Sequence, residues 1–210
     1  MTSELRVSEL LASRMCHDLA AGVGAIRNGI ELVADFDEDL SAEAMDLIGM
    51  SADQAAARLQ FYRMAYGEAG RRGLSTIHGV LDIARAIAES RNVTIEGDVG
   101  DPTLREGLGK LLLNMLALVF DALPRGGTVT LILASGGFRF EAAGPRAGLD
   151  TALRDTLDAR YDVSKLAPAT VHGFFTQQLA REVGRQVGFE QVNEDLCALF
   201  ERTSPTASIP

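Results

Sequence analysis

The sequence predicts an α + α/β protein, with an antiparallel helical hairpin followed by an α/β sandwich. Apolar residues recur every three or four positions through the first 66 residues, which is the spacing of one helix face. A glycine-rich segment at 67–73 then interrupts that pattern. Beyond it, short apolar runs alternate with helical patterns, as in a sheet covered by helices. We therefore expect a hairpin domain over 1–67, a linker over 68–75 and an α/β domain over 76–210.

Two long amphipathic helices are predicted for the hairpin. The first covers 3–34, and the second follows an acidic loop, with Asp39 or Ser41 as N-cap, and ends near Tyr66. The apolar stripe of the first helix consists of Leu11, Met15, Leu19, Ile26, Ile30 and Val33. The stripe of the second consists of Ala44, Leu47, Ser51, Ala55, Leu59, Tyr62 and Tyr66.

One hairpin cannot bury both of these stripes. Burial of a medium or large apolar side chain is worth roughly 1.5–3 kcal/mol, so an exposed stripe is costly. Two hairpins from two chains bury both stripes by forming a four-helix bundle. The sequence therefore predicts a homodimer.

The second half of the chain is predicted to be a mixed α/β domain. In order, the predicted elements are a helix over 77–90, a strand over 93–96, a helix over 102–123, strands over 128–134 and 138–143, helices over 148–160 and 169–187, and strands over 189–193 and 196–201. Pro102 opens the long apolar helix, since proline is favoured in a first turn. The segment 135–137 indicates a hairpin turn, and the tail 203–210 is expected to fray.

The charge and cysteine content exclude several classes of protein. The net charge is -9, and residues 1–67 hold 11 acidic and 5 basic side chains. Such a surface repels phosphate backbones and anionic lipids, so we expect no nucleic-acid and no membrane partner. Cys16 and Cys197 are far apart and lack metal-ligand spacing, which favours reduced thiols in a cytoplasmic protein. The start of the chain lacks the pattern of a signal peptide.

His17 is the candidate functional residue of the first helix. It lies two residues from both Met15 and Leu19, about 200° around the helix from each, so the imidazole is expected to point outward. Ala20, Ala21 and Gly24 follow it at helical spacing and leave a low surface beside the ring. An exposed histidine beside small side chains is suited to docking of another protein.

The residues around His17 resemble the phosphoacceptor helix of histidine kinases. That helix carries His-Glu/Asp-Leu followed by a proline and then an apolar pair. Here His17-Asp18-Leu19 is followed by Ala25-Ile26, and Gly22 stands where the family usually has the proline. A glycine permits a bend at this point without imposing one.

The order of elements after residue 76 resembles the ATP-binding domain of histidine kinases, but three nucleotide-contacting features are missing. Asn114 matches the first residue of the asparagine box, whereas Leu118 replaces the second asparagine, which helps to hold Mg²⁺. The segment 142–148 has no carboxylate where the kinases have the adenine-binding aspartate. The segment 170–175 has one glycine where they have a glycine-rich phosphate loop. We therefore expect no ATP binding and no ATP-dependent kinase activity.

Together these features resemble the ChpT-type bacterial histidine phosphotransferases over nearly the whole chain. The resemblance implies that His17 passes a phosphoryl group between aspartates of two receiver domains, with Mg²⁺ supplied by the receiver. Asp18 is expected to orient the ring, to act as a base, or to be only a solvated carboxylate. Arg14 either neutralises phosphate charge or is a surface arginine, while Arg27 and Asn28 are expected to line the docking surface.

The resemblance also implies partners, and it leaves alternatives open. The expected partners are a CckA-like hybrid kinase upstream and CtrA-like and CpdR-like response regulators downstream. The alternatives are an active histidine kinase, a binding module that sequesters a regulator, and a phosphatase-like attenuator that drains a receiver. His78 and His172 are further candidate acceptors, but neither lies in a matching motif.

Overall fold

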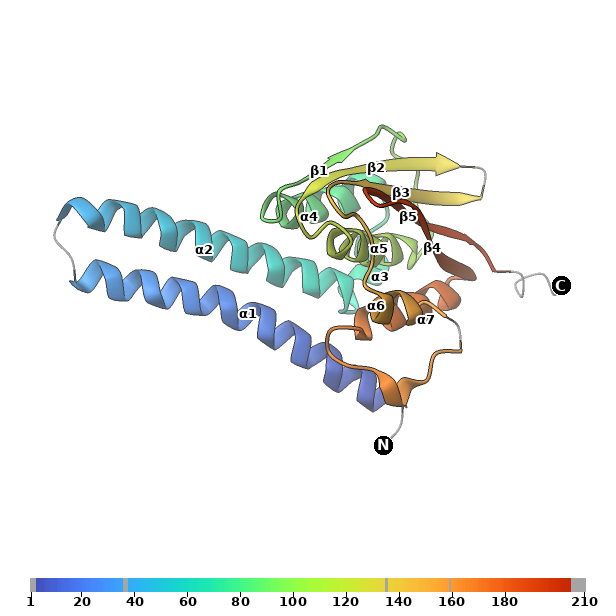
Figure 1. Ribbon diagram of the computed structural model, residues 1–210, viewed down its shortest axis with the longest axis horizontal. Coiled ribbons are helices and arrows are strands. Elements are labelled where there is room, and N and C mark those ends of the chain that lie inside the picture. Colours follow the sequence, from blue (N-terminus) through green and yellow to red (C-terminus); the bar gives the residue numbers. More distant parts are fainter. Residues whose placement is uncertain (1–2, 36–37, 135, 159, 205–210) are drawn as a thin grey trace.

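The computed structural model describes residues 3–35, 38–134, 136–158 and 160–204. It has the predicted fold class, a long helical hairpin that projects from a mixed α/β domain (Figure 1). The hairpin consists of α1 (Ser3–Asp35) and α2 (Glu38–Ala65). No helix within the described ranges has both the length and the hydropathy that crossing a bilayer requires.

Small residues let the two hairpin helices approach closely. A Cβ placed on Gly22 would lie 3.2 Å from the Cβ of Ala55, and one placed on Gly29 would lie 2.5 Å from Ile48 Cγ1. The second helix begins at Glu38, so Asp39 and Ser41 lie inside it and do not form the predicted N-cap. Two residues of the predicted acidic loop, 36 and 37, lie outside the described residues, as do 205–210 of the predicted frayed tail.

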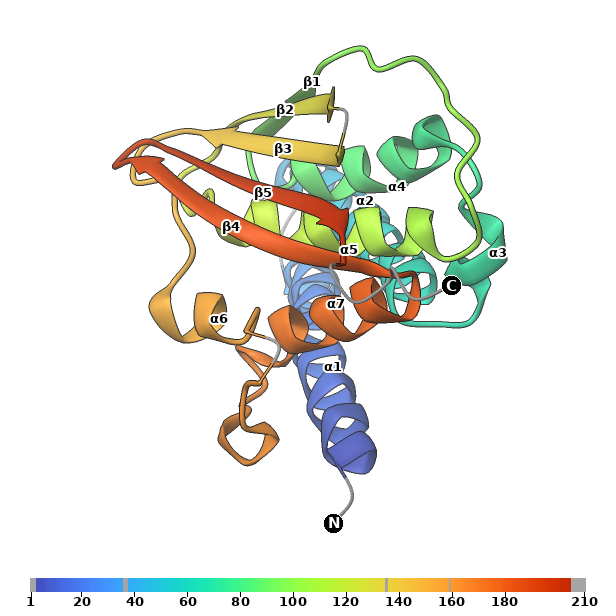
Figure 2. The ribbon, with the colours of Figure 1, turned by 90° about the vertical axis from the view of Figure 1, so that its right-hand side faces the viewer.

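The α/β domain is a five-stranded sheet with helices on one face (Figure 2). Its helices are α3 (Ala69–Gly73), α4 (Ile77–Glu89), α5 (Leu108–Asp121), α6 (Thr151–Asp155), the 3-10 helix η1 (Val163–Lys165) and α7 (Val171–Glu182). Its strands are β1 (Val93–Glu96), β2 (Gly127–Ala134), β3 (Gly137–Ala143), β4 (Arg185–Asn193) and β5 (Leu196–Thr203). The order is β1-β2-β3-β5-β4; β1 and β2 are parallel, and the other neighbours are antiparallel.

Several predicted boundaries are wrong for local reasons. Helix α5 does not begin at Pro102, because the chain stays irregular until Gly107, which has a φ of 81° at the N-cap. Helix α7 ends at Glu182 instead of reaching Val187, because Gly184 turns the chain with a φ of 66° into β4. Part of the predicted linker, 69–73, forms α3, and the predicted helix over 148–160 shortens to α6.

Helix α5 is the centre of the core and is buried on almost every side. Its leucines and Phe120 pack beneath the sheet and against the helices beside it. Two polar residues on the helix turn toward the hairpin. The Lys110 ammonium donates to the carbonyls of Tyr66 and Gly67, at 3.2 and 2.9 Å, and so satisfies carbonyls at the C-terminal end of α2.

Asn114 and His172 form a buried polar cluster where α2, α5 and α7 meet. The Asn114 amide nitrogen donates to the carbonyls of Ala65 and Lys110, both at 2.8 Å, which leaves its oxygen as an acceptor. His172 Nε2 lies 3.2 Å from that oxygen and must therefore carry the ring proton. Burial, with a further contribution from the charge of Arg14, lowers the pKa of His172 to about 3, so the ring is neutral.

We predict opposite effects for alanine at two helical glycines. A Cβ on Gly109 would overlap the Leu74 carbonyl oxygen and lie 2.6 Å from the Leu74 Cβ, so Gly109→Ala should lower the free energy of unfolding by about 2 kcal/mol. Gly49 has open space around its Cβ position, so Gly49→Ala should raise it by up to about 1 kcal/mol. Urea denaturation of the two variants beside the wild type measures both effects, and a stabilised Gly109→Ala protein would contradict this packing.

Burial of neutral His172 also predicts a dependence of stability on pH. The unfolded ring takes up a proton near pH 6.5, whereas the folded ring does so only near its pKa of about 3, so stability falls as pH drops between these values. Between about pH 8 and about pH 5 the loss from this residue should be about 2 kcal/mol. Urea denaturation at both pH values should show a smaller loss for His172→Gln than for wild type, and equal losses would refute the assignment.

Candidate functional site

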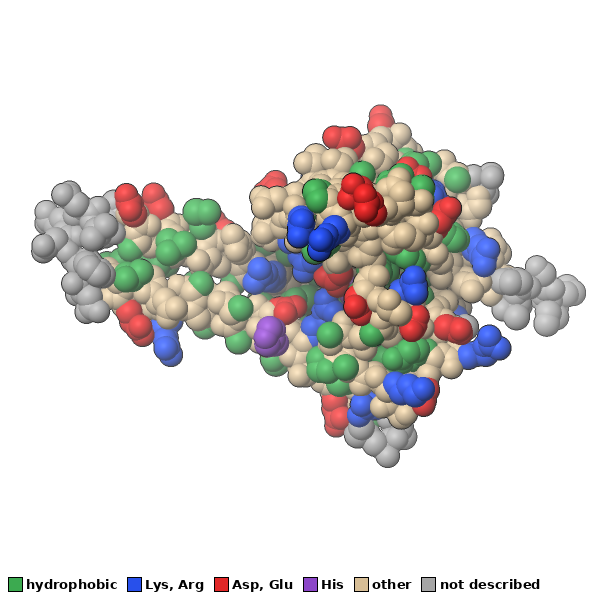
Figure 3. Space-filling view, viewed as in Figure 1, with side chains coloured by type: hydrophobic (Ala, Val, Ile, Leu, Met, Phe, Trp, Pro, Cys, Tyr) green, Lys and Arg blue, Asp and Glu red, His purple; other side chains and the backbone are tan. Residues whose placement is uncertain are grey.

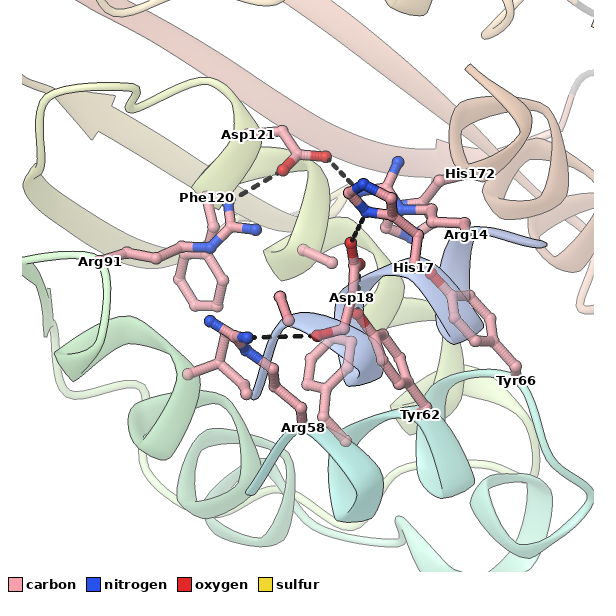
Figure 4. A pocket seen from close by; sticks show the side chains of 14 residues that line it. Arg14, His17, Asp18, Arg58, Tyr62, Tyr66, Arg91, Phe120, Asp121 and His172 are labelled. Atoms are coloured by element: carbon pink, nitrogen blue, oxygen red, sulfur yellow. Dashed lines mark hydrogen bonds and ion pairs between the residues drawn. The ribbon is translucent and has the colours of Figure 1, made fainter. Parts of the chain in front are cut away.

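A cavity of about 160 Å³ lies where the hairpin meets the α/β domain (Figure 4). It is lined from both parts of the chain, and its polar lining includes Arg14, His17, Asp18, Arg58, Arg91 and Asp121. In the space-filling view, a histidine is exposed at this junction with acidic and basic side chains beside it (Figure 3). The cavity thus brings the predicted residues of α1 beside residues that are distant in the sequence.

His17 points outward, as predicted, with 86% of its side chain exposed. Its Nδ1 lies 3.3 Å from Asp18 Oδ1. An ionised carboxylate only accepts hydrogen bonds, so in this pair Nδ1 carries the proton. In the neutral imidazole with this tautomer, the other ring nitrogen, Nε2, has a lone pair available for an incoming electrophile.

Asp18 is held by more than the histidine. The Tyr62 hydroxyl donates to Asp18 Oδ2 at 2.5 Å, and Arg58 donates to the Asp18 backbone carbonyl at 3.4 Å. Burial, together with the carboxylate of Asp18, raises the pKa of the Tyr62 phenol, which therefore stays protonated and a donor. The carboxylate thus has a fixed partner on each oxygen and is more than a solvated surface group.

Arg14 connects α1 to the α/β domain. Its side chain is 17% exposed, and its Nη2 lies 2.9 Å from Asp121 Oδ2 at the end of α5. Arg91 approaches the other oxygen of Asp121 at the same distance. Burial alone would raise the pKa of Asp121, but the two guanidinium groups outweigh burial and hold it below its usual value. Arg14 is therefore engaged in an interdomain ion pair.

The other residues predicted to form a docking surface lie along the outer side of α1. Ala20, Ala21 and Asn28 are exposed, and Gly24 is half-buried. Of these residues, Ala21 also lines the cavity. Arg27 is exposed and pairs with Glu31 one turn further along at 3.3 Å.

Four residues of the site were not predicted from the sequence. Tyr62 was assigned only to the buried stripe of the second helix, and Arg58, Arg91 and Asp121 were not singled out. For Arg58, the available signal was its position one turn before Tyr62 on the same predicted helix. The pairing of Arg14 with Asp121 joins residues 107 positions apart, and no local pattern reports it.

The other two histidines have different surroundings. His78 is exposed and pairs with Asp101, its Nδ1 lying 3.0 Å from the carboxylate. His172 is fully buried and hydrogen-bonded to Asn114. His172 also lines the cavity, but its ring is buried; His17 combines an exposed ring, an adjacent carboxylate and the cavity.

The positions that the resemblance to kinases assigned to nucleotide contacts are packed or hydrogen-bonded within the protein. Asn114 is buried, with its amide hydrogen-bonded to protein groups, and Leu118 is buried in the core. The segment corresponding to the phosphate loop runs directly into α7, whose first turn buries Val171 and His172.

Comparisons with known proteins agree with this architecture. Residues 79–195 match the family model for the histidine phosphotransferase C-terminal domain. The protein phosphotransferase ChpT of Brucella abortus is 31% identical over 199 residues, which span 92% of this chain and 94% of that protein.

Solved structures show the same relationship. A bacterial phosphotransferase aligns with a TM-score of 0.83 and 28% identity, over 96% of this chain and 98% of that one. The histidine kinase ThkA, solved in complex with the response regulator TrrA, aligns at 13% identity with a TM-score of 0.51. That alignment spans 99% of this chain and 66% of the kinase chain, and it shows a shared fold. The chain belongs to the ChpT-type histidine phosphotransferases.

Proposed function

We propose that His17 accepts a phosphoryl group from an aspartyl phosphate on one receiver domain and passes it to an aspartate on another. The observation that carries this proposal is the geometry of the imidazole. The ring is exposed beside a cavity, and its Nδ1 is held by Asp18, so Nε2 is free to react. A neutral imidazole is a good nucleophile, and phosphoryl transfer depends mainly on positioning and on neutralisation of charge.

The transfer step needs only the His17 imidazole and the aspartyl phosphate of the receiver domain. The lone pair of Nε2 forms a bond to phosphorus while the bond from phosphorus to the donor aspartate oxygen breaks. The bonding electron pair leaves on the donor carboxylate. Positive charge develops on the ring and is balanced through Nδ1–H by Asp18. Attack of a second receiver's carboxylate on phosphohistidine reverses this step, and the partners determine the net direction.

We further propose that the chain needs no cofactor of its own. Mg²⁺ would be held in the acidic pocket of the receiver, and ATP would not bind. Burial of Leu118 supports this, because an apolar side chain offers no oxygen to Mg²⁺ at that position. The amide of Asn114 is likewise engaged by carbonyls of α2 and α5.

The proposed partners are receiver domains of a CckA-like hybrid kinase and of CtrA-like and CpdR-like response regulators. The family membership supports receivers as a class of partner, and the complex of ThkA with a response regulator shows that a related fold binds one. We place the relay in the cytoplasm because Cys16 and Cys197 are both free thiols, as expected in a reducing compartment.

A homodimer is proposed from the apolar surface of the hairpin. Val23 and Ile30, seven residues apart on one face of α1, are 61% and 55% exposed. Leu59 on α2 is also exposed, and it lines an apolar groove with Met15, Tyr62 and Tyr66. A second hairpin packed on this face would bury these side chains in a four-helix bundle. His17 lies on another face of α1 and would remain accessible.

The proposed role of His17 predicts a sharp difference between two exposed histidines. His17→Ala should abolish phosphoryl uptake from a radiolabelled receiver domain, because the variant lacks the exposed imidazole that the proposal makes the acceptor. His78→Ala removes an exposed histidine that also pairs with an aspartate, and it should retain uptake at the wild-type level. Label transferred to the His17→Ala protein would show that the acceptor lies elsewhere.

The proposed dimer predicts a face-specific effect of charge. The double variant Val23→Glu/Ile30→Glu should sediment as a monomer, because two carboxylates in the bundle interface would be buried without partners. Leu32→Glu is the control, since Leu32 is an exposed apolar residue two positions from Ile30, about 200° around the helix. Analytical ultracentrifugation at micromolar concentration measures the oligomeric state of the double variant, of the control and of the wild type. A monomeric wild-type protein would contradict the dimer.

A further inference from the structure

We infer that Tyr62 is a positioning residue for phosphoryl transfer, which acts on His17 through Asp18. Its hydroxyl fixes the carboxylate in the orientation that keeps the ring proton on Nδ1. This inference rests on the proposed role of His17, and it adds a residue from the second helix of the hairpin to the reacting group.

The geometry forms a continuous chain of hydrogen bonds across the two helices. Tyr62 on α2 donates to one oxygen of Asp18, and the other oxygen faces Nδ1 of His17 at 3.3 Å (Figure 4). Arg58, one turn before Tyr62, donates to the Asp18 backbone carbonyl at 3.4 Å. Both the main chain and the side chain of Asp18 are thus held by α2.

The phenol ring of Tyr62 is itself rigidly placed. It is buried, with its ring stacked on Tyr66 at a centroid distance of 5.6 Å and edge-on to Phe61 at 5.9 Å. Packing on these rings limits movement of the hydroxyl. A rigid donor restricts the Asp18 carboxylate, whose terminal torsion is otherwise broad.

The neighbouring arginines Arg14 and Arg91 direct their ion pairs to Asp121 and not to Asp18. Arg14 and Arg91 are both engaged by Asp121, and the His172 imidazole is neutral and hydrogen-bonded to Asn114. The Tyr62 hydroxyl, which carries no charge, donates directly to the Asp18 carboxylate. It orients this group without adding a charge beside the incoming phosphoryl group.

The orientation matters because only one tautomer of His17 can react at Nε2. If the carboxylate rotates away, the proton is no longer held on Nδ1, and part of the population carries it on Nε2, where it blocks attack. The carboxylate also stabilises the positive charge that forms on the ring as the bond from nitrogen to phosphorus develops. Tyr62 thus contributes to the reaction without touching the phosphoryl group.

The test uses Tyr62→Phe, which keeps the packed ring and removes only the hydroxyl. We expect it to lower the rate of uptake from a radiolabelled receiver domain roughly tenfold, a part of what a positioned base contributes. Nitrogen-15 spectra of the His17 ring should show the Nε2–H tautomer increasing severalfold. Tyr66→Phe is the matched control, because it removes a hydroxyl from the ring stacked on Tyr62 and should leave both measurements unchanged.

A second variant tests the link without changing the buried aromatic cluster. Asp18→Asn should slow uptake and shift the tautomer ratio, and adding Tyr62→Phe to it should cause no further change, since both act through one hydrogen-bond chain. Thermal unfolding by circular dichroism verifies that each variant is folded.

The outcomes separate this inference from the function on which it rests. A wild-type rate and tautomer ratio in Tyr62→Phe, or additive losses in the double variant, would overturn the role of Tyr62. If His17→Ala is inactive in the same experiment, the relay through His17 still stands. Uptake by His17→Ala would instead remove the proposed function itself.

Discussion

The two ion pairs of Asp121 hold α1 against the α/β domain. This carboxylate stands at the C-terminal end of α5, where the helix dipole disfavours negative charge, and it is largely shielded from water. Arg14 from the hairpin and Arg91 from the α/β domain each contact one of its oxygens at 2.9 Å. Loss of either arginine would leave the partly buried Asp121 carboxylate with only one ion-pair partner, which would lower the stability of the fold. This contact lies beside the cavity at His17 and, with the hydrogen bonds of Lys110 and Asn114 to the end of α2, keeps the two parts together.

Helix α5 supports the hairpin through two of its polar side chains, since Lys110 and Asn114 both donate to carbonyl groups at the end of α2. Asn114, which matches the first residue of the kinase asparagine box, donates to carbonyls of α2 and α5 and accepts from His172. Leu118, one turn later, is packed in the core. A polar residue that resembles a ligand-binding group can therefore be retained for a purely structural reason.

Much of the fold, but less of the site, could be predicted from the sequence. Helical spacing identified both hairpin helices and the outward direction of His17, because the period of an α-helix is a local property. The predicted start of α5 at Pro102 was wrong, because the helix begins only after Gly107, which has a positive φ. The role of Tyr62 could not be predicted, because its helical spacing indicates a buried ring but gives no sign of the hydrogen bond from its hydroxyl to Asp18. The pairing of Arg14 with Asp121 depends on tertiary structure and has no local signal.

The Lys110 ammonium that closes the end of α2 has a consequence for recognition. By binding the carbonyls of Tyr66 and Gly67, it joins the hairpin to the α/β domain at the very point where a hinge would lie. Rotation there would break these bonds and leave carbonyl groups unpaired, which opposes large swings. The receiver domain that donates the phosphoryl group and the one that accepts it would therefore find the hairpin and the α/β domain in the same relative orientation. Under the proposed relay, both receivers would bind to one surface.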